Sequence, residues 1–215
     1  MATELNDSPR ALDALIDAVH RNPYDQHLAI RLSRMHIRKE NVKEAQVVLS
    51  NCIDKTPTAR RAKYQLAMLL MKNNEPDEIK EIGRLLRSGF SDGDTNYDIQ
   101  FWYARHEYLY GDRENSRKYF DTLRQNGTRI LKYANPTKSM VNDSDGSSKR
   151  FTASIINIRD SYCFAHVSEL NDDIFVHCTD CANDDDWKTM RLGDTVTLLI
   201  NFNSKGPHGV DLKPS

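Results

Sequence analysis

The chain has 215 residues, and its 30 Lys and Arg nearly balance 31 Asp and Glu, so the formal net charge is −1 at pH 7. The mean hydropathy is −0.68, no apolar run approaches the roughly 18 residues of a membrane span, and MATELNDSPR at the start lacks the features of a secretory signal. These features exclude a membrane protein and predict a cytoplasmic protein with two small domains.

The first half of the sequence contains an internal repeat with an offset of 34 residues, the spacing from Ala11 to Ala45. Small residues at two positions let neighbouring helices approach, Leu fills the space between them, and Pro ends the helix. This pattern is typical of the second helix of a helical hairpin. The matching pairs are Ala11 with Ala45, Leu15 with Leu49, Ala18 with Cys52, and Pro23 with Pro57.

Further helices are predicted around this repeat. Leu28, Leu32 and Met35 have helical spacing and supply the first helix of the hairpin that ends at Pro57. Two weaker hairpins follow in residues 59–89 and 98–127. Their predicted inward or turn positions are Tyr64, Ala67, Leu70, Met71, Ile79, Ile82 and Leu86 in one, and Ala104, Gly111, Ser116 and Phe120 in the other.

Residues 8–126 therefore resemble the tetratricopeptide repeat family, and a generic helical bundle is the alternative. The resemblance implies a scaffold that docks an unidentified protein partner. Because the pattern starts with a second helix, we expect the chain to be the C-terminal part of a larger protein. One alternative is an intact small protein whose first helix is a cap, and another is the regulatory region of an enzyme with its catalytic domain upstream.

A flexible linker is predicted over residues 127–149, where Asn, Ser, Asp and Gly cluster without periodicity. Arg129, Lys132 and Lys138 of this linker are candidates for phosphate contacts, or they are solvated linker charges.

Residues 150–215 have short β-branched and aromatic runs separated by polar turns, which predicts a small closed barrel. The fold class is therefore α+β in two domains, with an all-α helical-hairpin repeat followed by a five-stranded antiparallel β-barrel. The five candidate strands are residues 151–158, 162–168, 173–179, 195–202 and 208–213.

The segments NIRDSYCFAHV, DDIFVHCT, WKTMRLGDTV and NSKGPHGVDL resemble cold-shock domains, a family with the OB-fold, across this whole half. The pair Tyr162 and Phe164 matches the first nucleic-acid-binding motif of that family, and Phe175 and His177 match the second. Alternate residues of a strand point to one face, so these four rings would form a platform on which unpaired bases stack. We therefore expect binding of single-stranded RNA or DNA.

The resemblance also implies that Trp187, Lys205 and His208 flank the path of the strand. The alternative is that Trp187 seals the end of the barrel and that Lys205 only takes part in a turn.

The sequence departs from the family at several positions, where Ile155 and Ile156 replace two aromatic residues and Cys178 replaces a third. Residues 150–215 also carry 6 basic and 10 acidic side chains, so affinity must depend on stacking more than on phosphate contacts. The alternative is a barrel that has lost nucleic-acid binding and contacts a protein instead.

No catalytic motif is present in the sequence, so we expect a non-enzymatic protein without a cofactor. The run HCTDC, with Cys178 and Cys181, suggests zinc but lacks a fourth ligand, and we interpret Asp184, Asp185 and Asp186 as a solvated loop.

Overall fold

The computed structural model describes residues 9–73, 75–126, 139–143 and 145–215. The chain divides into two compact units, Met1–Tyr103 and Ala104–Ser215. Helices come first and a closed barrel follows, which confirms the predicted α+β architecture. Within these ranges, no helix combines the length and the apolar character that crossing a membrane requires.

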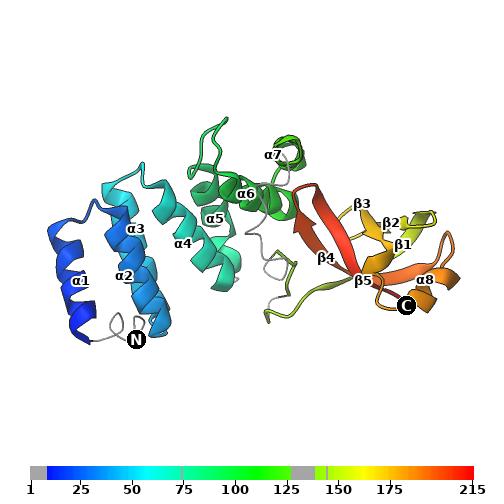
Figure 1. Ribbon diagram of the computed structural model, residues 1–215, viewed down its shortest axis with the longest axis horizontal. Coiled ribbons are helices and arrows are strands. Elements are labelled where there is room, and N and C mark those ends of the chain that lie inside the picture. The colour runs from blue at the N-terminus through cyan, green and yellow to red at the C-terminus, as the bar shows by residue number, and fades with distance from the viewer. Residues whose placement is uncertain (1–8, 74, 127–138, 144) are drawn as a thin grey trace. The chain divides into compact units, whose positions relative to one another are not determined.

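The first unit is a row of helices joined by short turns (Figure 1). Helix α2 contacts its neighbours α1 and α3 and also α4, the helix two places further on. This is the contact pattern of stacked hairpins. The elements are α1 (Pro9–Arg21), α2 (Gln26–Arg38), α3 (Val42–Lys55), α4 (Arg60–Asn73), the 3-10 turn η2 (Pro76–Glu78), α5 (Ile79–Arg87) and the start of α6 (Tyr97–Tyr110).

The repeated positions explain why these helices pack. Leu15 of α1 and Leu49 of α3 are both buried, and Ala45 has no exposed surface because the neighbouring helix lies against it. At the start of α2 the Asp25 carboxylate accepts hydrogen bonds from the backbone N–H groups of His27 and Leu28, at 2.7 and 3.3 Å. This cap satisfies two amides that the helix itself leaves unpaired.

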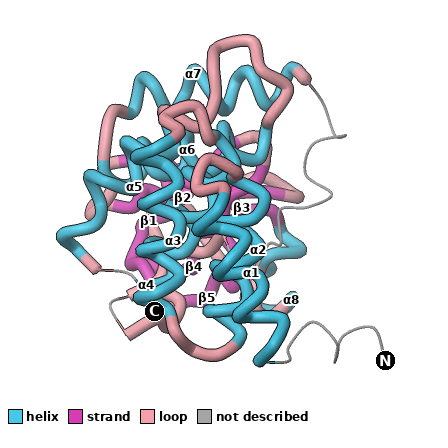
Figure 2. The backbone as a smooth tube through the Cα atoms, turned by 90° about the vertical axis from the view of Figure 1, so that its left-hand side faces the viewer, coloured by secondary structure: helices cyan, strands magenta, loops and turns pink. Residues whose placement is uncertain are grey.

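The second unit contains the rest of α6, α7 (Arg113–Gln125) and the barrel, whose strands are the magenta tubes in Figure 2. Residues 150–215, all of them described, form five strands that close in the order β1-β2-β3-β5-β4. Four strand pairs are antiparallel, as predicted, while β3 pairs with β5 in parallel. The elements are β1 (Arg150–Ile158), β2 (Tyr162–Val167), β3 (Asp172–His177), η4 (Cys178–Asp180), α8 (Asp184–Thr189), β4 (Thr195–Asn203) and β5 (Gly206–Pro214).

Alternation along the strands builds the core of the barrel. In β1 every second side chain from Phe151 to Ile155 is buried, and the residues between them are exposed. Strands β2 and β3 alternate in the same way, and aliphatic side chains fill the interior of the barrel. The fully buried ones include Ile174, Val176, Val196, Leu198, Ile200 and Leu212.

The described part of the segment 127–149 packs on the barrel. Ser139 is fully buried, its hydroxyl donates to the Asn201 side chain, and the backbone N–H of Val141 donates to the Ile200 carbonyl at 3.0 Å. Arg105 of α6 donates to the carbonyls of Ser139 and Met140 at 3.0 and 2.7 Å. The compact units divide after residue 103, whereas the sequence places a domain boundary after residue 126.

Arg129, Lys132 and Lys138, the predicted phosphate contacts of the linker, lie outside the described residues.

Candidate nucleic-acid interface

Strand β2 places two aromatic rings on the outside of the barrel. Its inward side chains, Cys163, Ala165 and Val167, are fully buried. Tyr162 and Phe164 alternate with them and therefore face outward, each partly exposed.

Strand β3 adds a third ring and an imidazole to the same face. Phe175 and His177 alternate with fully buried aliphatic residues, and Phe175 keeps 38% of its surface exposed. The register places Phe164 opposite Phe175 and Tyr162 opposite His177. The four predicted residues thus lie on neighbouring strands and on one face.

The three phenyl and phenol rings touch one another. The ring centroids of Tyr162 and Phe175 lie 5.6 Å apart with an interplanar angle of 29°. Phe164 meets Phe175 at 5.8 Å and 70°, and it meets Tyr162 at 5.9 Å and 87°. These are favourable offset and edge-to-face arrangements. We call these three residues the ring cluster.

His177 is held by the turn that follows β3. Its Nδ1 lies 2.8 Å from the Thr179 hydroxyl and accepts the Thr179 backbone N–H at 3.3 Å. Because Nδ1 is an acceptor, the neutral ring carries its proton on Nε2. The imidazole is therefore a fixed flat group with a donor on its far side.

Ile155 and Ile156, two positions where the sequence departs from the cold-shock pattern, lie in different environments. Ile155 is 1% exposed and belongs to the core, whereas Ile156 is 45% exposed. The register between β1 and β2 shifts between Ile155 and Asn157, so Ile156 occupies a bulge. Of the two isoleucines, only Ile156 therefore lies on the surface.

Trp187 lies at the turn that precedes β2. It belongs to the short helix α8, is partly exposed, and donates its indole N–H to the Asp160 carbonyl at 3.3 Å. Asp160 is two residues before Tyr162, so the indole is bonded to the turn that leads into β2. This position is compatible with both interpretations from the sequence, in which Trp187 either flanks the path of the nucleic-acid strand or seals the end of the barrel.

His208 and Lys205 occupy different places around β5. Val176 of β3 pairs with Gly209, so His208 projects from the same face as Phe175, and its Nδ1 lies 3.1 Å from the Asn203 amide nitrogen. Burial lowers the pKa of His208 below its ordinary value of 6.5, although Asp180 opposes the shift. The neutral imidazole therefore extends the face to a third strand.

Lys205 is exposed at the turn between β4 and β5, beside α7. Its backbone carbonyl accepts a hydrogen bond from Arg124 at 3.2 Å, and its N–H donates to the Asn203 side chain. No contact between Lys205 and the ring cluster is seen among the described residues.

Most basic side chains of residues 150–215 are already engaged. Arg150 and Lys213 pair with Asp211, and Lys188 pairs with Asp185. Arg191 is also engaged, because its guanidinium donates to the carbonyls of Lys188 and Met190.

Two cations of the barrel remain for phosphate contacts. Among the described residues, neither Arg159 nor Lys205 has a carboxylate partner. Arg159 is exposed and three residues before Tyr162, and it was not predicted because an isolated Arg in a turn gives no pattern. The face is therefore suited to stacking, with few phosphate contacts.

The cysteines beside the ring cluster do not assemble a metal site. Cys178 Sγ lies 3.8 Å from His177 Nδ1, whereas Cys181 Sγ lies 3.4 Å from the Leu212 carbonyl. In the part of the chain that the structure describes, no group of three potential ligands comes together.

Comparison with protein-family models gives no match for this chain, and a search among curated proteins gives none either.

Proposed function

We propose that residues 150–215 form a cold-shock-type barrel of the OB-fold that binds single-stranded RNA or DNA on the outer face of β2 and β3. The observation that carries this proposal is the ring cluster, in which Tyr162, Phe164 and Phe175 touch one another on a solvent-facing surface. Each base that stacks on such a ring contributes roughly 1–3 kcal/mol, with little dependence on base identity. His177 is the fourth member of the platform.

Exposed rings in mutual contact support a binding role on energetic grounds. Phe175 exposes apolar surface to water, which costs about 25 cal/mol per Å². A polar residue at this strand position would avoid that cost. A stacked base covers that surface. Paired bases have their faces covered already, so the proposal predicts a preference for single strands over duplex.

We further propose that the helical hairpins, which resemble tetratricopeptide repeats, dock an unidentified protein partner, and that the chain carries out no chemical step. The repeat positions Leu15 and Leu49 support the resemblance because both are buried, and Leu15 packs against Leu32 and Met35 of α2. Such stacks present extended surfaces for binding.

One observation favours a second candidate function. The barrel carries ten acidic and six basic side chains, which repels a polyanion at low salt and suits a protein partner instead. In that case the ring cluster would be a contact surface for a protein, and nucleic acid would not bind.

A fluorescence anisotropy titration separates the two candidates. The probes are labelled single-stranded RNA, single-stranded DNA and a duplex of the same sequence, each about 16 nucleotides long, the upper end of the site size per OB-fold. The variant Phe175→Ala removes the central ring, and Tyr110→Ala is the control because it removes an exposed ring from α6. Binding of single strands that Phe175→Ala weakens and Tyr110→Ala leaves unchanged supports the proposal. Equal binding by all three proteins, or none by the wild type, contradicts it.

A further inference from the structure

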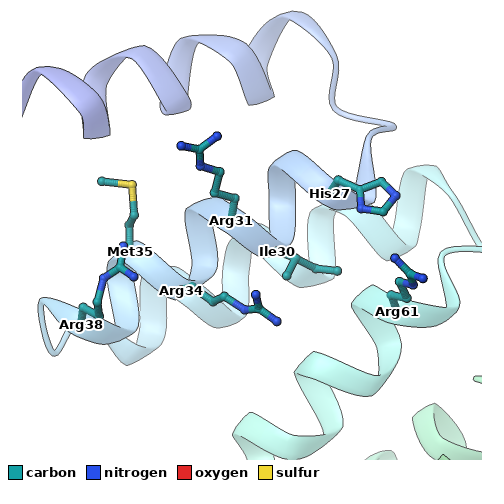
Figure 3. Close-up of a pocket in the computed structure, with 7 residues that line it drawn as sticks. All are labelled: His27, Ile30, Arg31, Arg34, Met35, Arg38 and Arg61. Carbon is teal, nitrogen blue, oxygen red and sulfur yellow. The ribbon is translucent and has the colours of Figure 1, made fainter. Parts of the chain in front are cut away.

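A basic hollow lies between α2 and α4 in the first unit (Figure 3). Its volume is about 380 Å³, and none of the described residues that line it is acidic. The lining residues are His27, Ile30, Arg31, Arg34, Met35, Arg38 and Arg61.

Helical spacing explains why the guanidinium groups gather here. Arg31, Arg34 and Arg38 stand at positions i, i+3 and i+7 of α2, so they share one side of the helix over roughly 10 Å. Arg61, in the first turn of α4, projects into the same hollow from the other helix, as Figure 3 shows.

Arg34 and Arg61 line the hollow from two different helices. Within the described ranges, neither Arg34 nor Arg61 pairs with a carboxylate. Both side chains are therefore available for an anion, and the guanidinium fork matches the oxygens of a phosphate or a carboxylate.

A second hollow of about 570 Å³ continues from the first, and Arg34 and Arg61 line both. It adds Tyr64 and the amide side chains of Gln65 and Asn96. Burial, with Asp98 nearby, raises the pKa of Tyr64 to about 12, so its hydroxyl stays neutral at physiological pH. The two hollows form one basic groove that also offers hydrogen-bonding groups and an aromatic ring.

The groove suits a phosphate backbone better than a peptide. Its apolar members, Ile30 and Met35, are only 8% and 3% exposed, so they offer no apolar anchor of the kind on which peptide affinity usually depends. The accessible groups are guanidiniums, an imidazole and amides. A single strand presents one negative charge per nucleotide along its length, which fits a row of cations.

We propose that the groove formed by α2 and α4 binds the phosphate backbone of a single-stranded nucleic acid through Arg34 and Arg61, flanked by Arg31 and Arg38. The choice of ligand rests on the proposed function, because the barrel offers rings but few free cations. The groove supplies the positive charge that the barrel lacks.

The test is a salt-dependent anisotropy titration of the full chain with labelled oligouridine of about 16 nucleotides, between about 50 and 200 mM salt. Four proteins are compared: the wild type, Phe175→Ala, the double variant Arg34→Gln/Arg61→Gln, and the control Arg84→Gln/Arg87→Gln. The control removes the same charge from α5, where Arg84 pairs with Glu81 and Arg87 with Asp92. Labelled polyglutamate is the second probe, and thermal unfolding checks that each variant folds.

We expect the groove variant to bind oligouridine roughly tenfold more weakly at the lowest salt and to flatten the slope of log K against log salt by about 1.4, since each lost phosphate contact removes about 0.7. The control should match the wild type. An unchanged slope in the groove variant overturns the inference, whatever Phe175→Ala does. Binding of polyglutamate but not oligouridine, lost in the groove variant, also overturns it and points to an acidic protein segment. If Phe175→Ala binds as the wild type does while the groove variant does not, the platform fails and the groove stands.

Discussion

The Tyr108 hydroxyl donates a hydrogen bond of 2.7 Å to Asp172 Oδ2, which joins the last turns of α6 to the first residue of β3. Arg113, the first residue of α7, donates to the same carboxylate at 3.1 Å, and its guanidinium lies 3.7 Å from the centre of the Tyr108 ring. Nearby, Phe120 stacks on Phe202 with a centroid distance of 6.1 Å and an interplanar angle of 13°. The barrel is thus covered by residues that precede it by many positions.

The first prediction concerns the extent of the folding unit. A fragment of residues 150–215 exposes Phe202, which is 2% exposed beneath Tyr108 and Phe120 in the intact unit. Burying a Phe side chain contributes about 1.5–3 kcal/mol. We expect residues 104–215 to unfold at a clearly higher urea concentration than 150–215, and equal midpoints would show that the helices add nothing.

The second prediction concerns the Tyr108–Asp172 bond. Tyr108→Phe leaves the ring in place but removes the donor, which should lower the free energy of unfolding by about 1–2 kcal/mol. The control is Tyr110→Phe, because Tyr110 is 52% exposed. Urea denaturation of both variants measures the difference, and similar values for the two would refute the assigned role.

The third prediction separates stability from binding. Phe175→Ala removes a ring from the surface and should weaken single-strand binding by about 1–3 kcal/mol, while the unfolding midpoint changes little. Phe202→Ala removes a core ring and should cost about 3–5 kcal/mol of stability. Anisotropy and urea unfolding on both variants test this contrast. A Phe175→Ala protein that is destabilised as much as Phe202→Ala would place the ring in the core.

The fourth prediction uses the two isoleucines of β1. Ile156→Phe adds a ring at the exposed bulge and should tighten single-strand binding by about 1–3 kcal/mol. Ile155→Phe instead overfills the core and should destabilise the barrel by about 1–3 kcal/mol without a gain in affinity. Titration of both variants decides the matter, and a gain in affinity from Ile155→Phe alone would contradict the orientation of β1.

The fifth prediction concerns pH. Burial lowers the pKa of His208 in the folded state below 6.5, so the unfolded chain binds this proton first as the pH falls. The contribution of His208 to stability is therefore present above the pKa that it has in the unfolded chain. This contribution decreases as the pH falls below that pKa toward the lower pKa of the folded state. We expect the unfolding midpoint to fall less between about pH 7 and 5 in His208→Gln than in the wild type. Parallel pH profiles for the two proteins would show that His208 is not the group responsible.

Local patterns were sufficient to predict most of the barrel and the ring cluster. A period of two in FTASIINI and YCFAHV fixes which side chains face inward, and it therefore fixes the common face of Tyr162 and Phe164. The helical spacing of Leu15, Leu49 and their neighbours likewise predicted the helices of the first unit.

Features that depend on distant contacts were not predicted. Tyr108 and Asp172 are 64 residues apart, and nothing local in either segment indicates that they meet. The bulge at Ile156 was missed because it arises from the register between two strands, and the sequence shows only the run of isoleucines. The groove arginines were missed although Arg31, Arg34 and Arg38 have a helical period, because only the apolar residues of that helix were used as a pattern.

The most direct test of the stacking platform is photo-crosslinking of the full chain to a single strand that contains 4-thiouridine, with adducts located by mass spectrometry. We expect adducts on peptides that contain Tyr162, Phe164 or Phe175, and we expect an excess of unlabelled strand to remove them. A strand that binds the protein but gives adducts only on peptides without these three rings would contradict binding at the ring cluster.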